Sequence, residues 1–249
     1  MIVSVTPGTD LSGVWSALHL KEKYMSDYIP ADAEKTNSYL ASVEDVVSAY
    51  VELRDRMITF LRDLPEDVAD TVVPYCPEWT VQKTVSHMVG VPDALLLGDF
   101  DGIASDAWTQ RQVERHRGLS LAALADKWEE QSEQFMAMLP QIPQPALSQL
   151  VFDVTSHEHD VRHAVGKPGA RDSAAVEVGA GFMKNIIEMR KKLEVSVVDH
   201  WPISTFEVFR TLGARRSLEQ IAALGLDVEY VKEAIDPLPI SIPTVSIAE

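Results

Sequence analysis

Apolar residues recur at spacings of three and four along much of the chain, which predicts a mainly helical protein. The first such stretch begins at Ser42, which forms a helix-start signal with Asp45, and it ends at Leu64-Pro65. Its apolar positions are Val43, Val46, Val47, Tyr50, Val51, Leu53, Met57, Phe60 and Leu61. This periodicity predicts a helix with one buried face.

Similar patterns predict further helices downstream. One begins at Thr80, and Pro92 is expected to kink or restart it, because proline cannot donate the helical hydrogen bond. Trp79 and Trp128 are expected in the core. The other predicted helices span residues 106–117, 120–139, 146–165 and 173–193.

The last part of the chain differs in character. Ser217 and Gln220 form a capping box that predicts a short helix, whereas residues 236–249 are rich in proline and isoleucine and are expected to be extended. Residues 195–198 are the one candidate β-strand. We therefore divide the chain into an N-terminal lead-in (1–35), a helical bundle (36–196) and a small C-terminal appendage (197–249).

Charge and cysteine content narrow the class of protein. The 249 residues carry 38 acidic and 22 basic side chains, a net charge of −16. A field of this sign repels phosphate backbones and anionic lipids, so neither nucleic acid nor a membrane is an expected partner. The chain lacks a signal-peptide pattern and a long apolar run, and its single cysteine, Cys76, suits a reducing compartment. We therefore expect a cytoplasmic protein.

Histidines and carboxylates gather in residues 152–163. A zincin His-Glu-x-x-His motif is excluded, because a valine follows His157 at the fourth position. Asp153 with His157, and His159 with His163, remain as pairs one helical turn apart. A carboxylate and an imidazole one turn apart, as in Asp153 and His157, can hold one cation between them.

Helical geometry separates these two pairs. Asp153, His157 and Asp160 lie within about 60° of each other around a helix, and the apolar positions centre roughly 80° from Asp153. This edge therefore borders the core, whereas His159 and His163 point away from it and are expected on a solvated face. Two ligands are too few for a tight metal site, so a third must come from elsewhere.

His87 is the candidate for that third ligand. It lies on the flank of the apolar stripe of the helix that begins at Thr80, beside Val91 and Ala94. Spacing alone leaves the simpler interpretation open, in which each histidine is only a hydrogen-bonded interior or surface residue.

Several short motifs follow one another along the chain. They are Cys76-Pro77-Glu78-Trp79-Thr80-Val81, His87-Met88-Val89-Gly90, Leu121-Ala122-Ala123-Leu124-Ala125-Asp126-Lys127-Trp128 and Asp153-x-x-x-His157-x-x-Asp160-Val161-x-x-Ala164-x-Gly166-x-Pro168-Gly169. A tail motif follows, Phe206-Glu207-Val208-Phe209-Arg210 with Gly213-Ala214-Arg215-Arg216-Ser217. In this order they resemble the mycothiol-dependent maleylpyruvate isomerase family, actinobacterial relatives of the DinB-like metal-binding bundles. The resemblance runs from about residue 42 to the end.

The resemblance implies a DinB-like four-helix bundle with a small C-terminal appendage and one divalent metal. Carried onto this chain, the metal ligands are His87, Asp153 and His157, with Asp160 as a partner that orients an imidazole. Zinc is the metal that the family implies, and nickel, iron and manganese also suit two histidines and a carboxylate. Asp153 stands where the family has a longer carboxylate side chain.

Three protein ligands leave a coordination position open, which is typical of catalytic sites. The resemblance implies that the metal holds mycothiol as a thiolate, which then adds to or is transferred to a small electrophile. Arg216 and Arg210 are the implied catalytic arginines, because a guanidinium pairs with a carboxylate through two hydrogen bonds. Cys76 is expected to be a small packed residue at the helix entry.

The residues and the resemblance together leave two classes of function. The first is a metal-dependent thiol transferase or isomerase that uses mycothiol and a small-molecule electrophile. The second is a divalent-metal-binding bundle without catalysis, such as a sensor, a stress protein or a partner-binding protein. A homodimer is compatible with both.

Overall fold

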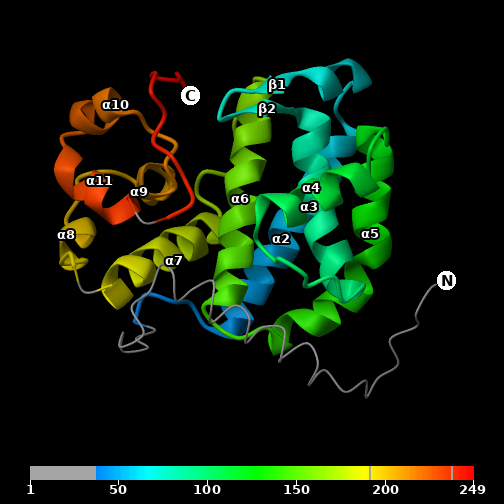
Figure 1. Cartoon of the computed structure of the whole chain (residues 1–249), viewed down its shortest axis with the longest axis horizontal. Helices are drawn as coiled ribbons and strands as arrows, with labels where there is room; N and C mark the ends of the chain where they lie inside the picture. Colours follow the sequence, from blue (N-terminus) through cyan, green and yellow to red (C-terminus); the bar gives the residue numbers. More distant parts are fainter. Residues whose placement is uncertain (1–37, 191, 237) are drawn as a thin grey trace.

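The computed structural model describes residues 38–190, 192–236 and 238–249, which form a mainly helical protein (Figure 1). The helical fold predicted from the apolar spacing is therefore confirmed. The predicted N-terminal lead-in, residues 1–35, lies outside the described residues. Among the helices described, none is long and apolar enough to cross a lipid bilayer.

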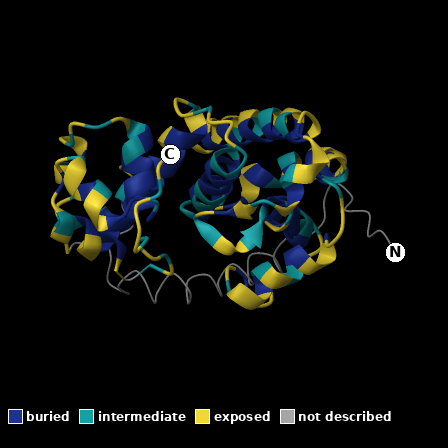
Figure 2. Cartoon of the chain, turned by 90° about the horizontal axis from the view of Figure 1, so that it is seen from above, coloured by how far each residue is buried: buried dark blue, intermediate teal, exposed yellow. Residues whose placement is uncertain are grey.

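Four helices form the bundle that contains the main core. They are α2 (Val43–Arg62), α3 (Val81–Leu96), α5 (Leu121–Met138) and α6 (Ala146–Ala164), and both α2 and α3 pack against α5 and α6. A shorter helix, α4 (Asp106–Arg115), covers α3 (Figure 1). Buried residues lie on the inward faces of these helices and exposed residues on the outward faces (Figure 2). This is the arrangement that amphipathic helices adopt to remove apolar surface from water.

The predicted helix starts are formed by side-chain caps. The Ser42 hydroxyl accepts a hydrogen bond from the backbone N–H of Asp45, and Thr80 and Ser120 cap α3 and α5 in the same way. Such a cap satisfies one of the free N–H groups at a helix start. At Pro92, where a kink or a restart was predicted, α3 continues as one helix, which excludes the restart and leaves the kink a prediction.

A short β-hairpin precedes α3 and was not predicted. Strand β1 (Val72–Val73) pairs antiparallel with β2 (Cys76–Thr80). Strands this short give too few alternating positions for a sequence pattern. Two 3₁₀ turns, η1 (Glu66–Asp70) and η2 (Leu139–Gln141), complete this half of the chain. The hairpin places Tyr75, Cys76 and Trp79 at the end of the bundle where α3 begins.

The C-terminal part consists of further helices. They are α7 (Ala174–Arg190), α8 (Ser196–Asp199), α9 (Thr205–Leu212), α10 (Leu218–Ala223) and α11 (Val228–Ile235). The capping box predicted at Ser217 is present at the start of α10. Because α7 packs against both α6 and α9, the division at residue 196 stays a prediction.

The strand predicted over residues 195–198 is wrong, because this segment contains the single turn α8. Three valines favour a strand in isolation. In the structure, Val198 is buried in an apolar cluster with residues of α7 and α9. Tertiary packing therefore overrides the local preference.

His159 on α6 is buried, which corrects the expectation of a solvated face. Only 3% of the residue is exposed, and its ring lies 4.8 Å from that of Phe206 and 6.1 Å from that of Phe209. Periodicity predicts one buried face for α6, but α9 covers a second face. Burial, with the positive charge of Arg210 beside it, lowers the pKa of His159 to about 3.

We expect His159→Phe to reduce the acid sensitivity of the fold. His159 stays neutral in the native state, whereas in the unfolded chain it takes up a proton below its ordinary pKa of 6.5. Its contribution therefore lowers stability as the pH falls from about 6.5 toward about 3, by about 2 kcal/mol at about pH 5. Urea unfolding of both proteins at pH 7 and pH 5 measures this difference, and an equal loss in both would contradict it.

Candidate metal centre

The buried imidazole of His87 on α3 faces the partly exposed carboxylate of Asp153 on α6. Its Nε2 lies 3.1 Å from Oδ2 of Asp153, although the two residues are far apart in sequence. On the other side of the ring, Nδ1 lies 2.7 Å from Oε1 of Gln112 on α4. The imidazole is buried, so these two contacts fix its orientation.

His157 completes the group one helical turn after Asp153. Its Nε2 lies 3.7 Å from Oδ1 of Asp153, and its ring centre is 5.2 Å from that of His87. One donor atom from each of the three residues lies within 4.8 Å of the other two. The structure thus brings together the three side chains that the sequence motifs indicated as ligands.

The spacing of the donor atoms fits one small divalent cation. Nitrogen and oxygen ligands at about 2.05 Å from a tetrahedral zinc lie about 3.3 Å apart, close to the two separations around Asp153. The hydrogen bond to Gln112 gives a second indication. Because an amide oxygen only accepts, Nδ1 of His87 carries the proton, and its Nε2 then faces the Asp153 carboxylate. Two acceptors face each other there unless a proton or a metal ion lies between them.

The charges of the group also favour a cation. Burial alone lowers the pKa of His157, but the neighbouring Asp160, Cys76 and Asp153 outweigh this and raise it to about 10. Burial raises the pKa of Asp153, but the neighbouring His87 and His157 outweigh this and lower it to about 2. Asp153 is therefore ionised, and a proton competes with a metal for the imidazole of His157.

Asp160 lies on the other side of His157. Its Oδ2 is 3.5 Å from Nδ1 of His157, and the carboxylate accepts hydrogen bonds from Arg210 at 2.9 Å and from Arg215 at 2.9 Å. Burial raises the pKa of Asp160, but the two guanidinium groups outweigh it and hold the pKa well below its usual range. Its predicted role in orienting the imidazole stays a prediction.

Cys76 on β2 forms a second possible donor set with His157 and Asp160. The sequence predicted only a packing role for this residue, and it does contact the main apolar core. Both oxygens of Asp160 already accept hydrogen bonds from arginine side chains. Their positive charges compensate the carboxylate, which makes it a weaker ligand for a metal cation. The set around Asp153 is the better cation site for this reason.

Trp79 forms a wall of the site, although the sequence predicted it to lie in the core. It is half-buried, and its ring centre lies 5.4 Å from that of His87 and 5.9 Å from that of His157. It comes from β2, outside the bundle, because the unpredicted hairpin folds back over the start of α3. Trp128 lies in the core as predicted, where its indole N–H donates to Tyr50.

Gln112 is a site residue that no sequence pattern indicated. It is buried on α4, and that helix approaches α3 closely because position 90 is a glycine. A Cβ at Gly90 would lie 2.5 Å from Cβ of Gln112, so any larger residue would push α4 away. Gln112 lies 25 positions from His87 in the sequence. A local sequence pattern therefore does not indicate that the two side chains are in contact.

The two arginines predicted to be catalytic are engaged in ion pairs. Arg210 contacts Asp160 and Glu249, and Arg216 contacts Glu207 and Glu249. Arg215, which was not predicted to be catalytic, reaches the same carboxylate of Asp160. A catalytic role for Arg210 and Arg216 is therefore untested and stays a prediction.

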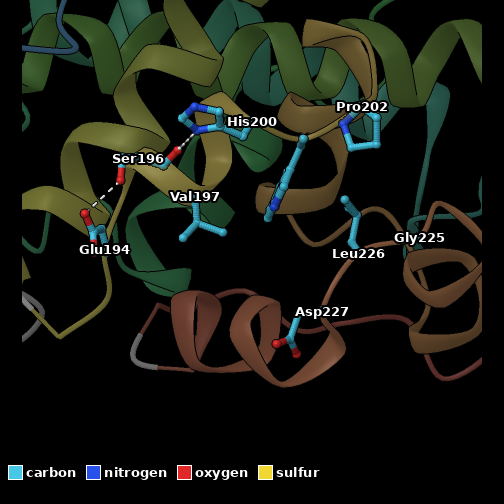
Figure 3. A pocket seen from close by; sticks show the side chains of 9 residues that line it. Glu194, Ser196, Val197, His200, Pro202, Gly225, Leu226 and Asp227 are labelled. Carbon is cyan, nitrogen blue, oxygen red and sulfur yellow. Dashed lines mark hydrogen bonds between the residues drawn. The ribbon is translucent and has the colours of Figure 1, made fainter.

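A surface hollow of about 560 Å³ lies beside α8 and the turn that leads into α11 (Figure 3). None of the residues that line it belongs to the group around Asp153. Its polar side chains have structural roles, since Asp227 caps α11 and Nδ1 of His200 donates to the carbonyl of Ser196. We find no catalytic arrangement among these lining residues.

The geometry defines a helical bundle in which two central helices bring two histidines and a carboxylate together. Residues 50–165 match the family model described as the mycothiol maleylpyruvate isomerase N-terminal domain. This match confirms the resemblance over residues 50–165, the part of the chain that contains His87, Asp153 and His157. No curated protein and no solved structure gives a significant match.

Proposed function

We propose that the protein binds one divalent metal, zinc in the first instance, through His87, Asp153 and His157. With this metal bound, the protein acts as a cytoplasmic thiol transferase or isomerase. It uses mycothiol as the thiol and a small electrophile as the second substrate. The observation that carries the proposal is the distance of 3.1 Å and 3.7 Å from the two imidazoles to the two oxygens of one carboxylate. Membership of residues 50–165 in the family supports the choice of thiol.

The side chains of this site have separate roles in the proposal. Gln112 holds His87 in the tautomer that leaves Nε2 free for coordination, and Asp160 lies beside the other ring nitrogen of His157. Trp79 covers one side of the two imidazoles and limits the access of water. When bound, the metal lowers the pKa of a coordinated thiol and keeps it as the nucleophilic thiolate.

Cobalt substitution tests this proposal directly. We expect the cobalt-loaded protein to develop a thiolate-to-cobalt charge-transfer band when mycothiol is added, because the open coordination position accepts the sulfur. The S-methylated thiol is the matched ligand control and should give no band. The band should persist in His163→Ala, since His163 lies on the same helical segment but outside the metal group.

The outcome separates the two classes of function. A full cobalt complement without a band at saturating thiol would contradict thiol activation and favour a metal-binding bundle without catalysis. Failure to bind cobalt at all would contradict the metal site itself.

A further inference from the structure

The carboxylate of Glu249 is inserted between two arginine side chains. Its Oε1 lies 3.0 Å from Nη2 of Arg210, and its Oε2 lies 2.6 Å from Nη1 of Arg216. Only 6% of the Glu249 side chain is exposed, while the residue as a whole is exposed. The ring of Tyr75 packs against Arg210 at 4.6 Å, and its hydroxyl accepts from Arg216 at 3.4 Å. The side chain thus points inward from a segment that runs over the surface.

The charges around this carboxylate balance only when it is present. Arg210, Arg215 and Arg216 supply three positive charges, and all three side chains are largely buried. Besides Glu249, the carboxylates paired with them are Asp160 and Glu207. One positive charge therefore remains for Glu249, or for another anion in the same place. A buried cation without a counter-ion is costly in free energy. Without Glu249, the arginines would therefore attract another anion.

The segment that carries Glu249 is held by few contacts. The amide of Gln220 donates to the carbonyl of Ile247, and the hydroxyls of Ser217 and Ser246 lie 2.8 Å apart. Ile242 is the last residue of the described chain that packs against an apolar cluster, and Val245 is 66% exposed. Because little apolar surface is buried after residue 242, displacement of this segment costs little.

This group of paired charges adjoins the candidate metal centre. The same Arg210 that contacts Glu249 donates through Nη1 to Asp160, and Asp160 lies beside His157. The extended C-terminal segment runs between the hairpin end of the bundle and the C-terminal helices (Figure 1). A ligand at the arginines would therefore lie near the metal-binding side chains.

We propose that Tyr75, Arg210 and Arg216 form a binding site for the carboxylate of a small ligand, which Glu249 occupies from within the chain until the ligand displaces it. Arg210 Nε and Nη2 and Arg216 Nη1 are the nitrogens that Glu249 contacts and that the ligand would take over. Bidentate contacts of this kind distinguish a carboxylate from neutral groups. If the ligand is the proposed electrophile, that electrophile carries a carboxylate. Binding at the arginines is measured without thiol and without added metal. The thiol chemistry and the carboxylate site can therefore fail separately.

Titration calorimetry with succinate tests this inference on the full chain, in a buffer free of carboxylates. We expect Glu249→Ala to bind succinate about tenfold more tightly than the unmodified protein, because the internal competitor is gone. Succinamide, the neutral analogue, should bind to neither. The double variant Glu249→Ala/Arg216→Ala should lose the gain. Glu229→Ala is the charge-matched control, since Glu229 is exposed and pairs with Lys232 at the surface, and it should behave as the unmodified protein.

Equal affinities for succinate, or no binding to folded Glu249→Ala, would overturn the inference and leave a purely structural ion pair. Circular dichroism establishes that the variant is folded. If Glu249→Ala does not fold, Glu249→Gln is used for the same comparison, because it keeps the shape of the side chain and removes the charge.

Discussion

His87→Ala and His157→Ala should each reduce bound metal from about one equivalent to near none. Each substitution removes one of three donors and leaves two, which do not hold a divalent cation tightly. The expected loss of affinity exceeds the roughly 10–100-fold effect of removing a residue that only orients a ligand. Mass spectrometry of metals in untagged protein measures it.

His163→Ala is the matched control for this experiment. His163 lies on α6 with His157, but its ring packs against Tyr75 and it belongs to neither donor set. This variant should keep its metal, and all three variants should keep the helical circular dichroism signal. Metal retained in both His87→Ala and His157→Ala would contradict the three-ligand site.

Asp160→Asn should destabilise the fold by about 3–5 kcal/mol. The carboxylate has no exposed surface and pairs with Arg210 and Arg215, of which Arg210 is fully buried. The amide keeps the size of the side chain but removes its negative charge, so two guanidinium groups lose their common counter-ion. Urea unfolding at neutral pH measures the change in free energy.

Asp126→Asn provides a comparison with an exposed ion pair. Asp126 contacts Arg62 at the surface, and 68% of its side chain is exposed. Water already screens this pair, so the unfolding midpoint should change little. A similar loss of stability in both variants would show that burial of Asp160 is not the cause.

Local sequence determined the helices and one edge of the site. Ser42, Thr80 and Ser120 mark helix starts because a side-chain oxygen close to a free N–H acts over a few residues. The same locality places Asp153 and His157 one turn apart on α6. The family motifs added His87, which spacing alone left as one interpretation among others.

The packing of distant segments decided the rest. His159 was expected in solvent, but α9 covers it. Trp79 was expected in the core, but the hairpin places its ring against the two imidazoles. Gln112 reaches His87 only because Gly90 lets α4 lie close to α3. None of these contacts follows from periodicity, since periodicity gives the faces of a helix and not the segments that cover them.

The arginines show this division most clearly. The sequence motif named Arg210 and Arg216, but Glu249 lies far from both along the chain and carries no pattern of its own. Their meeting depends on the path of the last segment past α10, which a few hydrogen bonds hold. The helices and the ligand pair on α6 follow from local sequence, because both depend on neighbours within about one turn. The pairing of the buried charges follows from the packed fold alone, because it depends on contacts between segments far apart in the chain.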